Sequence, residues 1–152
     1  MDSSAIEARL LRLEDVEAIR RLKADYGAAC DDDHNGDRVA ALFVSDGTWH
    51  SSNSHLCTGH DAIRDYMFGI RASGRIRHST HMFTNPVIDV EGDDAAGSWS
   101  FLMMFTNQMN GDLHRIVGFY DERYARRDGR WLFRSLQANI QDAAVYGPRS
   151  GG

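Results

Sequence analysis

The chain has 152 residues, which is the length of one domain. It is 42% hydrophobic and 26% charged, as soluble globular domains are, and at this size folding buries enough surface for a core and an internal pocket. Its 17 basic and 22 acidic side chains give a net charge of −5. That balance argues against a nucleic-acid partner, because binding to phosphates depends on a basic patch.

Nothing in the sequence predicts export or a membrane partner. The N-terminal residues lack the basic region followed by an apolar region that marks a secretory signal. No apolar run approaches the roughly 18 residues that a membrane span needs. We therefore expect a cytoplasmic protein. Cys30 and Cys57 are its only cysteines, too few for a disulfide framework or a four-cysteine zinc site.

The first half of the sequence predicts helices. Ser4 and Glu7 fit a capping box, and apolar residues then recur at steps of three and four, as in an amphipathic helix. A short second helix is predicted over Arg38–Val44 with Asp37 as its N-cap, and a third over Asp61–Gly74. The apolar series of the first helix is Ile6, Leu10, Leu13, Val16, Ile19, Leu22 and Tyr26.

The second half of the sequence predicts strands joined by tight turns, and Asp128-Gly129 is a strong two-residue hairpin signal. Helices followed by hairpin-linked strands predict an α+β domain whose helices cover one face of an antiparallel sheet. We expect a single domain over residues 1–145 and a flexible tail over residues 146–152. The predicted strands are His78–Val90, Ala95–Asn107, Leu113–Arg127 and Arg130–Ala143.

Seven histidines raise the question of a metal site. Zinc needs three or four ligands that converge from defined elements, whereas these histidines are scattered over predicted loops and alternate strand faces. We therefore expect no metal. Two of them, His78 and His81, lie on one predicted strand, where a spacing of three places them on opposite faces. The others are expected to be solvated (His34, His60 and His114) or at most to border a pocket (His50 and His55).

Three consecutive aspartates, Asp31, Asp32 and Asp33, end the first predicted helix. Most such triplets at a helix end are solvated. Helical periodicity places Cys30 and Asp33 nearer the apolar face than Asp31. The pattern of the residues by itself therefore does not select a functional carboxylate.

Short motifs follow one another in order from about residue 5 to residue 140. They are Tyr26-Gly-Ala-Ala-Cys-Asp31, Gly36-Asp37, Ala41-Leu-Phe43, Asp46-Gly-Thr-Trp49, Gly59-His-Asp-Ala-Ile63, His81-Met-Phe-Thr-Asn85-Pro-Val-Ile88, Gly92-Asp-Asp-Ala95, Gly118-Phe-Tyr120 and Arg127-Asp-Gly-Arg-Trp131. Their order and spacing resemble the SnoaL-like branch of the NTF2-like superfamily. Within it the chain is similar to scytalone dehydratase, hexachlorocyclohexane dehydrochlorinase and bile-acid 7α-dehydratase.

The resemblance implies a cone-shaped α+β barrel in which a curved antiparallel sheet wraps around helices and forms a deep pocket. It also implies a dyad, in which an aspartate at the end of the first helix pairs with a strand histidine. That pattern falls on Asp31 and His81, and so selects Asp31 over Asp33. A carboxylate that accepts one imidazole N–H fixes the tautomer and stabilises the cation formed on proton abstraction. The other ring nitrogen then acts as general base, with no metal or organic cofactor.

The function that the resemblance implies is that of a cofactor-independent lyase of the dehydratase or elimination type. Its substrate would be a small, mostly apolar cyclic or aromatic molecule. Tyr26 is expected to donate a hydrogen bond to a substrate oxygen or a developing enolate. Substrate-binding residues are expected at Trp49, Phe83 and Trp99. The alternatives are an isomerase similar to ketosteroid isomerase or polyketide cyclase, and a non-catalytic NTF2-like protein that binds a small ligand.

One departure from the family pattern concerns the general acid. Scytalone dehydratase carries a second histidine, and the bile-acid enzyme an aspartate, in the region that here is Ala95–Phe101, which contains neither. The acid is therefore open between Tyr26 and a bound water. The resemblance also implies a homo-oligomer, either a trimer or a dimer, because relatives pack the outer face of the sheet against neighbours and Ser98–Phe105 has apolar residues on both faces.

Overall fold

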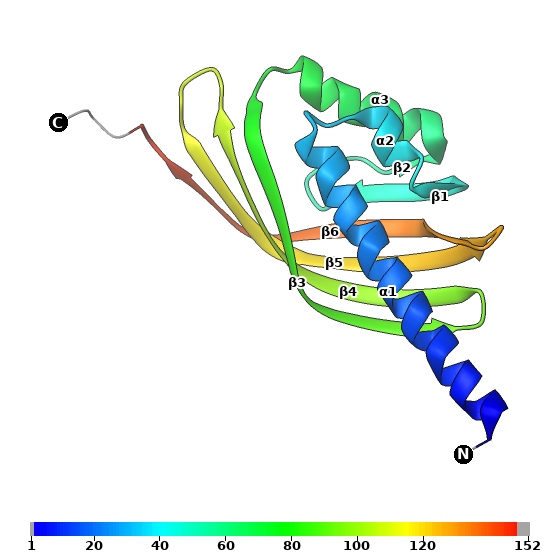
Figure 1. Ribbon diagram of the computed structural model, residues 1–152. Coiled ribbons are helices and arrows are strands. Elements are labelled where there is room, and N and C mark those ends of the chain that lie inside the picture. The colour runs from blue at the N-terminus through cyan, green and yellow to red at the C-terminus, as the bar shows by residue number, and fades with distance from the viewer. Residues whose placement is uncertain (1, 149–152) are drawn as a thin grey trace.

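A computed structural model describes residues 2–148 of the chain. One long curved sheet wraps around the helices, with α1 lying diagonally across its concave face and α2 and α3 closing one end (Figure 1). The expected α+β class is confirmed. The helices are α1 (Ser3–Asp31), α2 (Gly36–Ala40) and α3 (Gly59–Ala72), and the strands are β1 (Phe43–Ser51), β2 (Cys57–Thr58), β3 (Ile76–Glu91), β4 (Asp94–Asn107), β5 (Leu113–Arg127) and β6 (Arg130–Tyr146).

The sheet is mixed. Its strand order is β2-β1-β6-β5-β4-β3, in which β3 to β6 form an antiparallel meander and β1 runs parallel to β6. The predicted second helix is present, but its predicted end at Val44 is wrong, because α2 ends at Ala40 and the chain turns to pair with β6. The backbone N–H of Phe133 donates to the carbonyl oxygen of Leu42, and Phe43 lies opposite Phe133. Strand pairing with a distant segment thus overrides local helix propensity here.

The helix boundaries differ slightly from the predicted ones. Asp2 caps α1, with its carboxylate accepting the backbone N–H of Ala5 at 2.8 Å. The N-cap of α2 is Asn35 instead of Asp37. Both caps supply the side-chain oxygen that the unpaired N–H groups of a first helical turn require.

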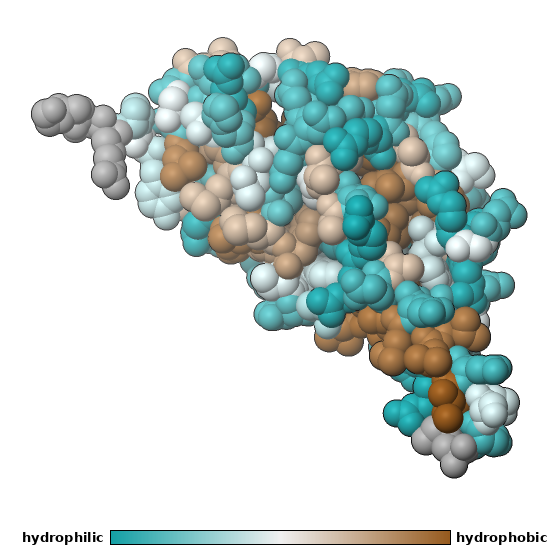
Figure 2. Space-filling model, viewed as in Figure 1, coloured by the Kyte–Doolittle hydropathy of each residue, from teal (hydrophilic) through white to brown (hydrophobic). Residues whose placement is uncertain are grey.

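From Asp15 onward α1 packs on the sheet, and Asp15 itself bonds to Arg126 and Trp131. Ile19, Leu22 and Tyr26 are buried, as the apolar series predicts, whereas Leu10 and Leu13 are 54% and 66% exposed. The first turns of the helix project past the edge of the sheet (Figure 1), and a hydrophobic patch lies over them (Figure 2). The apolar series that predicted the helix therefore includes residues in the first turns that cover no core of this chain.

Two β-bulges interrupt strand β3. His78 and Asn85 have left-handed backbones, with φ of 51° and 53°, and the register with β4 shifts at both places. Between the bulges Ser79, His81 and Phe83 face the helices, while His78 is exposed. The predicted placement of His78 and His81 on opposite faces is confirmed.

The last strand extends into the predicted C-terminal tail. Tyr146 is the last residue of β6, so the sheet reaches the first residue of the predicted tail, and residues 149–152 lie outside the described part. Within residues 2–148 no helix is long and apolar enough to span a membrane.

Candidate active site

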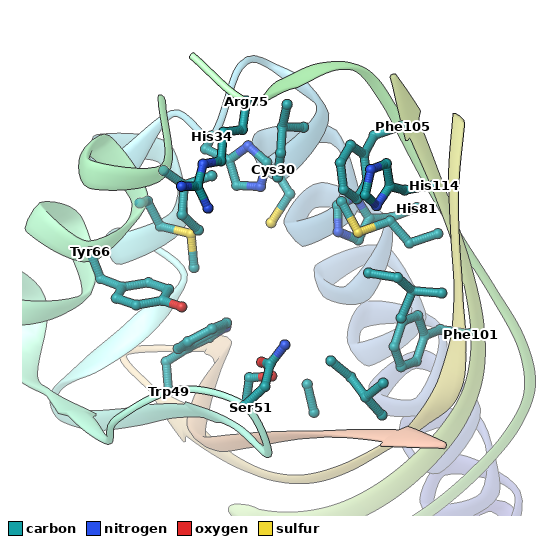
Figure 3. A pocket seen from close by; sticks show the side chains of 18 of the residues that line it. Cys30, His34, Trp49, Ser51, Tyr66, Arg75, His81, Phe101, Phe105 and His114 are labelled. Carbon is teal, nitrogen blue, oxygen red and sulfur yellow. The ribbon is translucent and has the colours of Figure 1, made fainter. Parts of the chain in front are cut away.

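A cavity of about 700 Å³ lies between the helices and the concave face of the sheet (Figure 3). Its walls are largely apolar: Met67 and Ile70 of α3 face Phe101, Met103 and Phe105 of β4. Among its described lining residues there is no carboxylate, although three histidines and Arg75 contribute polar groups. Such a pocket suits a mostly apolar molecule with a few polar contacts.

The carboxylate of Asp31 and the ring of His81 meet at the wall of this cavity. Asp31 is the last residue of α1, and its Oδ1 lies 2.6 Å from Nδ1 of His81. Its Oδ2 accepts the backbone N–H of His81 at 2.9 Å, and Ser79 Oγ donates to Oδ1 at 3.0 Å. Asp33, which helical periodicity favoured, is exposed and forms an ion pair with Arg71.

These contacts determine the state of both groups. Burial acts to raise the pKa of Asp31, but the hydrogen bonds from the His81 ring, the His81 backbone and Ser79 together lower it below its ordinary value. An ionised carboxylate can only accept, so Nδ1 of His81 carries a proton, and in the neutral ring Nε2 holds the lone pair. The His81 side chain is 7% exposed and lines the cavity, and within residues 2–148 its Nε2 has no hydrogen-bond partner. The ring thus presents a free proton acceptor to the cavity.

Tyr26 and Trp49 form part of the cavity lining next to the dyad. The indole N–H of Trp49 donates to the hydroxyl oxygen of Tyr26 at 2.9 Å, and the Trp49 ring lies 4.8 Å from the Tyr66 ring. Burial raises the pKa of Tyr26 well above its ordinary value. Its hydroxyl therefore stays protonated at neutral pH.

Two predicted substrate contacts, Phe83 and Trp99, are not among the residues that line the cavity. The Phe83 ring packs on Gly27, where an added Cβ would lie 2.8 Å from its Cε2 atom. Trp99 is buried and donates its indole N–H to the hydroxyl of Tyr124 at 3.1 Å. Both side chains pack in or against the core and lie outside the cavity lining.

Behind the cavity wall lies a buried ion pair that the sequence analysis missed. Lys23 donates to Glu122, which also accepts the hydroxyl of Tyr124. The ammonium group lies 3.4 Å from the centroid of the Tyr120 ring. Burial lowers the pKa of Lys23 to about 8, although Glu122 acts in the opposite direction. The sequence pattern could have located this pair. Lys23 follows Ile19 by four residues and so lies on the apolar face of the helix, and Glu122 lies two residues from each of two buried strand tyrosines, Tyr120 and Tyr124.

The expectation that His34 and His114 are solvated is wrong. His34 is 5% exposed, lines the cavity and has its ring centroid 6.3 Å from that of His81. Burial, and next the neighbouring His81, lower the pKa of His34 to about 4. His114 stacks on Phe105 with centroids 4.6 Å apart and also lines the cavity. The spacing Tyr26, Cys30, His34 continues the buried face of α1 in steps of four, and this signal could have located His34.

Two of the other histidines are half-buried and have protein hydrogen-bond partners, among them His60, which was expected to be solvated. His60 Nε2 lies 2.8 Å from the carbonyl oxygen of Phe43, and His50 bonds to Gln137 and to the backbone of Ser54. Across residues 2–148, no group of three or more histidine, cysteine or carboxylate side chains is placed to hold a metal ion.

Comparison with known proteins places this geometry in a family. The SnoaL-like domain matches residues 11–137, which is most of the chain. The chain belongs to the SnoaL-like family. A provisionally assigned scytalone dehydratase from Novosphingobium aromaticivorans is 26% identical over 91% of each chain, with a TM-score of 0.80.

Two dehydrochlorinases share the fold of this SnoaL-like chain at lower identity. A type 2 hexachlorocyclohexane dehydrochlorinase is 21% identical over 94% of this chain and 99% of its own, with a TM-score of 0.82. A type 3 enzyme from Novosphingobium barchaimii is 23% identical over 91% of this chain and 94% of its own, with a TM-score of 0.81. The expected NTF2-like cone fold is confirmed.

Proposed function

We propose that this chain is a lyase that eliminates a leaving group from a small, mostly apolar cyclic molecule, with His81 as general base. The observation that carries the proposal is the 2.6 Å contact between Asp31 Oδ1 and His81 Nδ1, which leaves Nε2 unpartnered in the cavity. The names of the structural relatives, a dehydratase and dehydrochlorinases, support the same reaction class.

The elimination can be written with this chain's own residues. Nε2 of His81 takes a proton from a substrate C–H, and the electron pair of that bond becomes the new C=C bond. The leaving group departs from the adjacent carbon with its bonding pair. The imidazolium returns its proton to a departing hydroxide, which leaves as water, or to solvent when a halide departs. Asp31 stabilises the imidazolium in between.

Tyr26 and Trp49 take supporting roles in the proposal. Tyr26 keeps its proton because burial disfavours its anion. Its hydroxyl also interacts with Tyr120, so it would have to turn from Tyr120 to donate to a substrate oxygen or enolate. Trp49, whose indole N–H holds the Tyr26 hydroxyl, supplies a flat apolar wall. We infer that the ring of the substrate packs against this wall.

Two other functions would use the same cavity, and the turnover experiment below distinguishes them from a lyase. An isomerase similar to ketosteroid isomerase or polyketide cyclase would use the same base but return the proton to a different atom of the substrate. A non-catalytic binding protein would hold a ligand in the cavity and convert nothing. The dyad favours catalysis over simple binding, since a free, oriented proton acceptor adds nothing to the affinity for an apolar ligand.

The experiment measures turnover of scytalone and of hexachlorocyclohexane, alongside cyclic alcohols, ketones and halides that raise the melting temperature of the protein. His81→Ala is expected to lower kcat at least about 100-fold on any substrate converted. The matched control is His78→Asn, which replaces an exposed histidine on the same strand by a residue that tolerates its left-handed backbone. Unimpaired turnover by His81→Ala would exclude the proposal, and binding without turnover by the wild type would favour the binding protein.

We further propose that the chain forms a homo-oligomer. The exposed apolar residues on the first half of α1 include Leu10, Leu11 and Leu13. An apolar helix face that covers nothing in its own chain is typical of a protein contact.

A further inference from the structure

His34 is a largely buried side chain whose ring nitrogens open on the cavity. Its ring lines the cavity and, among the described residues, neither ring nitrogen forms a hydrogen bond. Neither nitrogen is shut off from the cavity, since neither is a fully buried atom without a partner. A ligand in the cavity can therefore reach a ring nitrogen that the protein leaves free. Figure 3 shows the rings of His34 and His81 both bordering the open space of the cavity.

The backbone that carries His34 is held in an unfavourable conformation. Asp33 and His34 have φ of 50° and 49°, a region that side chains other than glycine seldom adopt. Arg71 holds this turn through its Nε, which donates to the carbonyl oxygen of Asp33 at 2.7 Å, and the His34 N–H donates to Cys30. Strain that is maintained by surrounding contacts is common at functional sites.

The two cavity histidines differ in what they offer a ligand. His81 gives its only ring proton to Asp31 and so presents a lone pair. His34 has no such partner, and burial holds its pKa at about 4, so at neutral pH its uncharged ring carries one N–H donor. The hydroxyl of Tyr26, by contrast, already interacts with Trp49 and Tyr120. His34 is therefore a donor that the protein leaves free on the wall nearest the His81 ring.

We propose that His34 is a second catalytic residue, which donates an imidazole N–H hydrogen bond to an oxygen on the substrate carbon next to the one deprotonated by His81. The inference rests on the proposed function. The ring centroids are 6.3 Å apart, which lets one molecule contact both rings through adjacent carbons. The substrate class is then an oxygenated ring, a cyclic alcohol or ketone, in preference to a halogenated hydrocarbon, because a halide is a weak acceptor.

The test compares two probes that differ by one oxygen, 2-tetralone and tetralin, by calorimetric titration. A ketone oxygen only accepts hydrogen bonds, so it cannot bind the lone pair of His81. The measured quantity is the ratio of the affinity for 2-tetralone to the affinity for tetralin. This ratio should be about two- to tenfold higher for the wild type than for His34→Phe, which is the value of one hydrogen bond. His34→Asn, which suits the left-handed backbone and keeps an N–H donor, should retain part of the preference. His78→Asn should retain all of it.

A second measurement covers the case in which His34→Phe does not fold. In the wild type, 2-tetralone should shift the ring nitrogen resonances of His34, whereas tetralin should not. The inference is overturned if the preference persists in His34→Phe, if the wild type binds neither probe, or if those resonances stay fixed. On scytalone, His34→Phe should lower kcat about 100-fold, the usual effect of losing one oxyanion donor. These readouts separate the two proposals, since loss of turnover in His81→Ala tests the base and the probe preference tests His34.

Discussion

The carboxylate of Asp31 holds His81 at two points, because Oδ1 contacts the ring at Nδ1 and Oδ2 accepts the backbone N–H of the same residue. The helix end and the strand are thereby joined at the residue that carries the proposed chemistry. Ring rotation would break the first contact, while a shift of the strand would break the second. The base is therefore oriented before any substrate arrives, which is what a catalytic group needs to avoid reorganisation during the reaction.

Asp31→Asn should lower kcat by about 100- to 10,000-fold on any substrate found. An amide has one oxygen and one NH₂ group, so it cannot accept from both the ring and the backbone N–H of His81. It also lacks the charge that stabilises the imidazolium. Steady-state kinetics measure the effect, with Ser79→Ala as the comparison, because that change removes one hydrogen bond and leaves the carboxylate in place. Equal kcat values for Asp31→Asn and the wild type would contradict this role.

Stability should fall as the pH is lowered from 6.5 to 4, and His34 should account for part of the fall. The folded pKa of His34 is about 4 and its ordinary value is 6.5, so in this window the unfolded chain binds a proton that the folded chain does not. The slope from one such group is at most about 1.4 kcal/mol per pH unit. Urea unfolding at pH 7, 6 and 5 should give a shallower slope for His34→Asn than for the wild type.

Two comparisons sharpen that measurement. His78→Asn should keep the slope of the wild type, because its ring is exposed. Asp31 acts in a different window: its folded pKa lies below the ordinary value of 3.8, so its contribution is present above that value and is lost only as the pH falls further. The groups that face His34 are His81, Asp31, Asp33 and Arg71. Parallel slopes for His34→Asn and the wild type would show that His34 is not buried as described.

Lys23→Met should destabilise the fold by about 3–5 kcal/mol, because it leaves Glu122 buried without its counter-ion. The double variant Lys23→Met with Glu122→Gln should recover much of this loss, since no uncompensated charge then remains. Chemical denaturation of both variants measures the difference. A single variant as stable as the wild type, or a double variant less stable than the single, would contradict the expectation.

Two glycine substitutions should act in opposite directions. A Cβ at Gly118 would lie 2.1 Å from the carbonyl oxygen of Asn139 and 2.8 Å from Phe101, so Gly118→Ala should destabilise by about 1–3 kcal/mol or more. A Cβ at Gly69, within α3, has no heavy atom within 4 Å. Gly69→Ala should therefore stabilise by about 0.5–1 kcal/mol. Melting temperatures of the two variants check the signs, and a lower value for Gly69→Ala would be the contrary result.

Replacing Leu10 and Leu13 by glutamate should reduce the size of the assembly. Both side chains are exposed and touch no core of their own chain, so charges there should leave the monomer folded. Light scattering after gel filtration gives the mass, and circular dichroism reports the fold. A wild type that is already monomeric, or a variant of unchanged mass, would place the contact elsewhere.

The sequence predicted the regular parts of the fold well. The turn signals located both ends of β5 and placed the start of β4 within one residue. They missed β1 because the pairing of Phe43 with Phe133 joins segments far apart in the chain, which no local pattern encodes. They also missed the end of α2, where that pairing begins.

The site was less accessible to pattern reasoning. Asp31 came from the family resemblance, and periodicity favoured Asp33, because the helix ends at Asp31 and the following turn carries the other carboxylates away. His34 was assigned to solvent because it lies in an acidic turn, yet that turn folds inward over the cavity. Phe83 was assigned to the pocket because it shares the strand face of His81, although that face continues past the cavity into the core, and Trp99 also packs in the core.

The two bulges of β3 have a consequence for anyone who engineers this protein. Each adds one residue to the strand and so inverts which side chains point inward, and His81 lies between the two inversions. A one-residue deletion at His78 would change which face of the sheet Ile76 points to, relative to His81. A one-residue insertion between Ser79 and His81 would turn one of these two side chains to the opposite face. Transplanting the dyad into another scaffold therefore means moving residues 78–85 as one block, with their count unchanged, together with the end of α1 that carries Asp31.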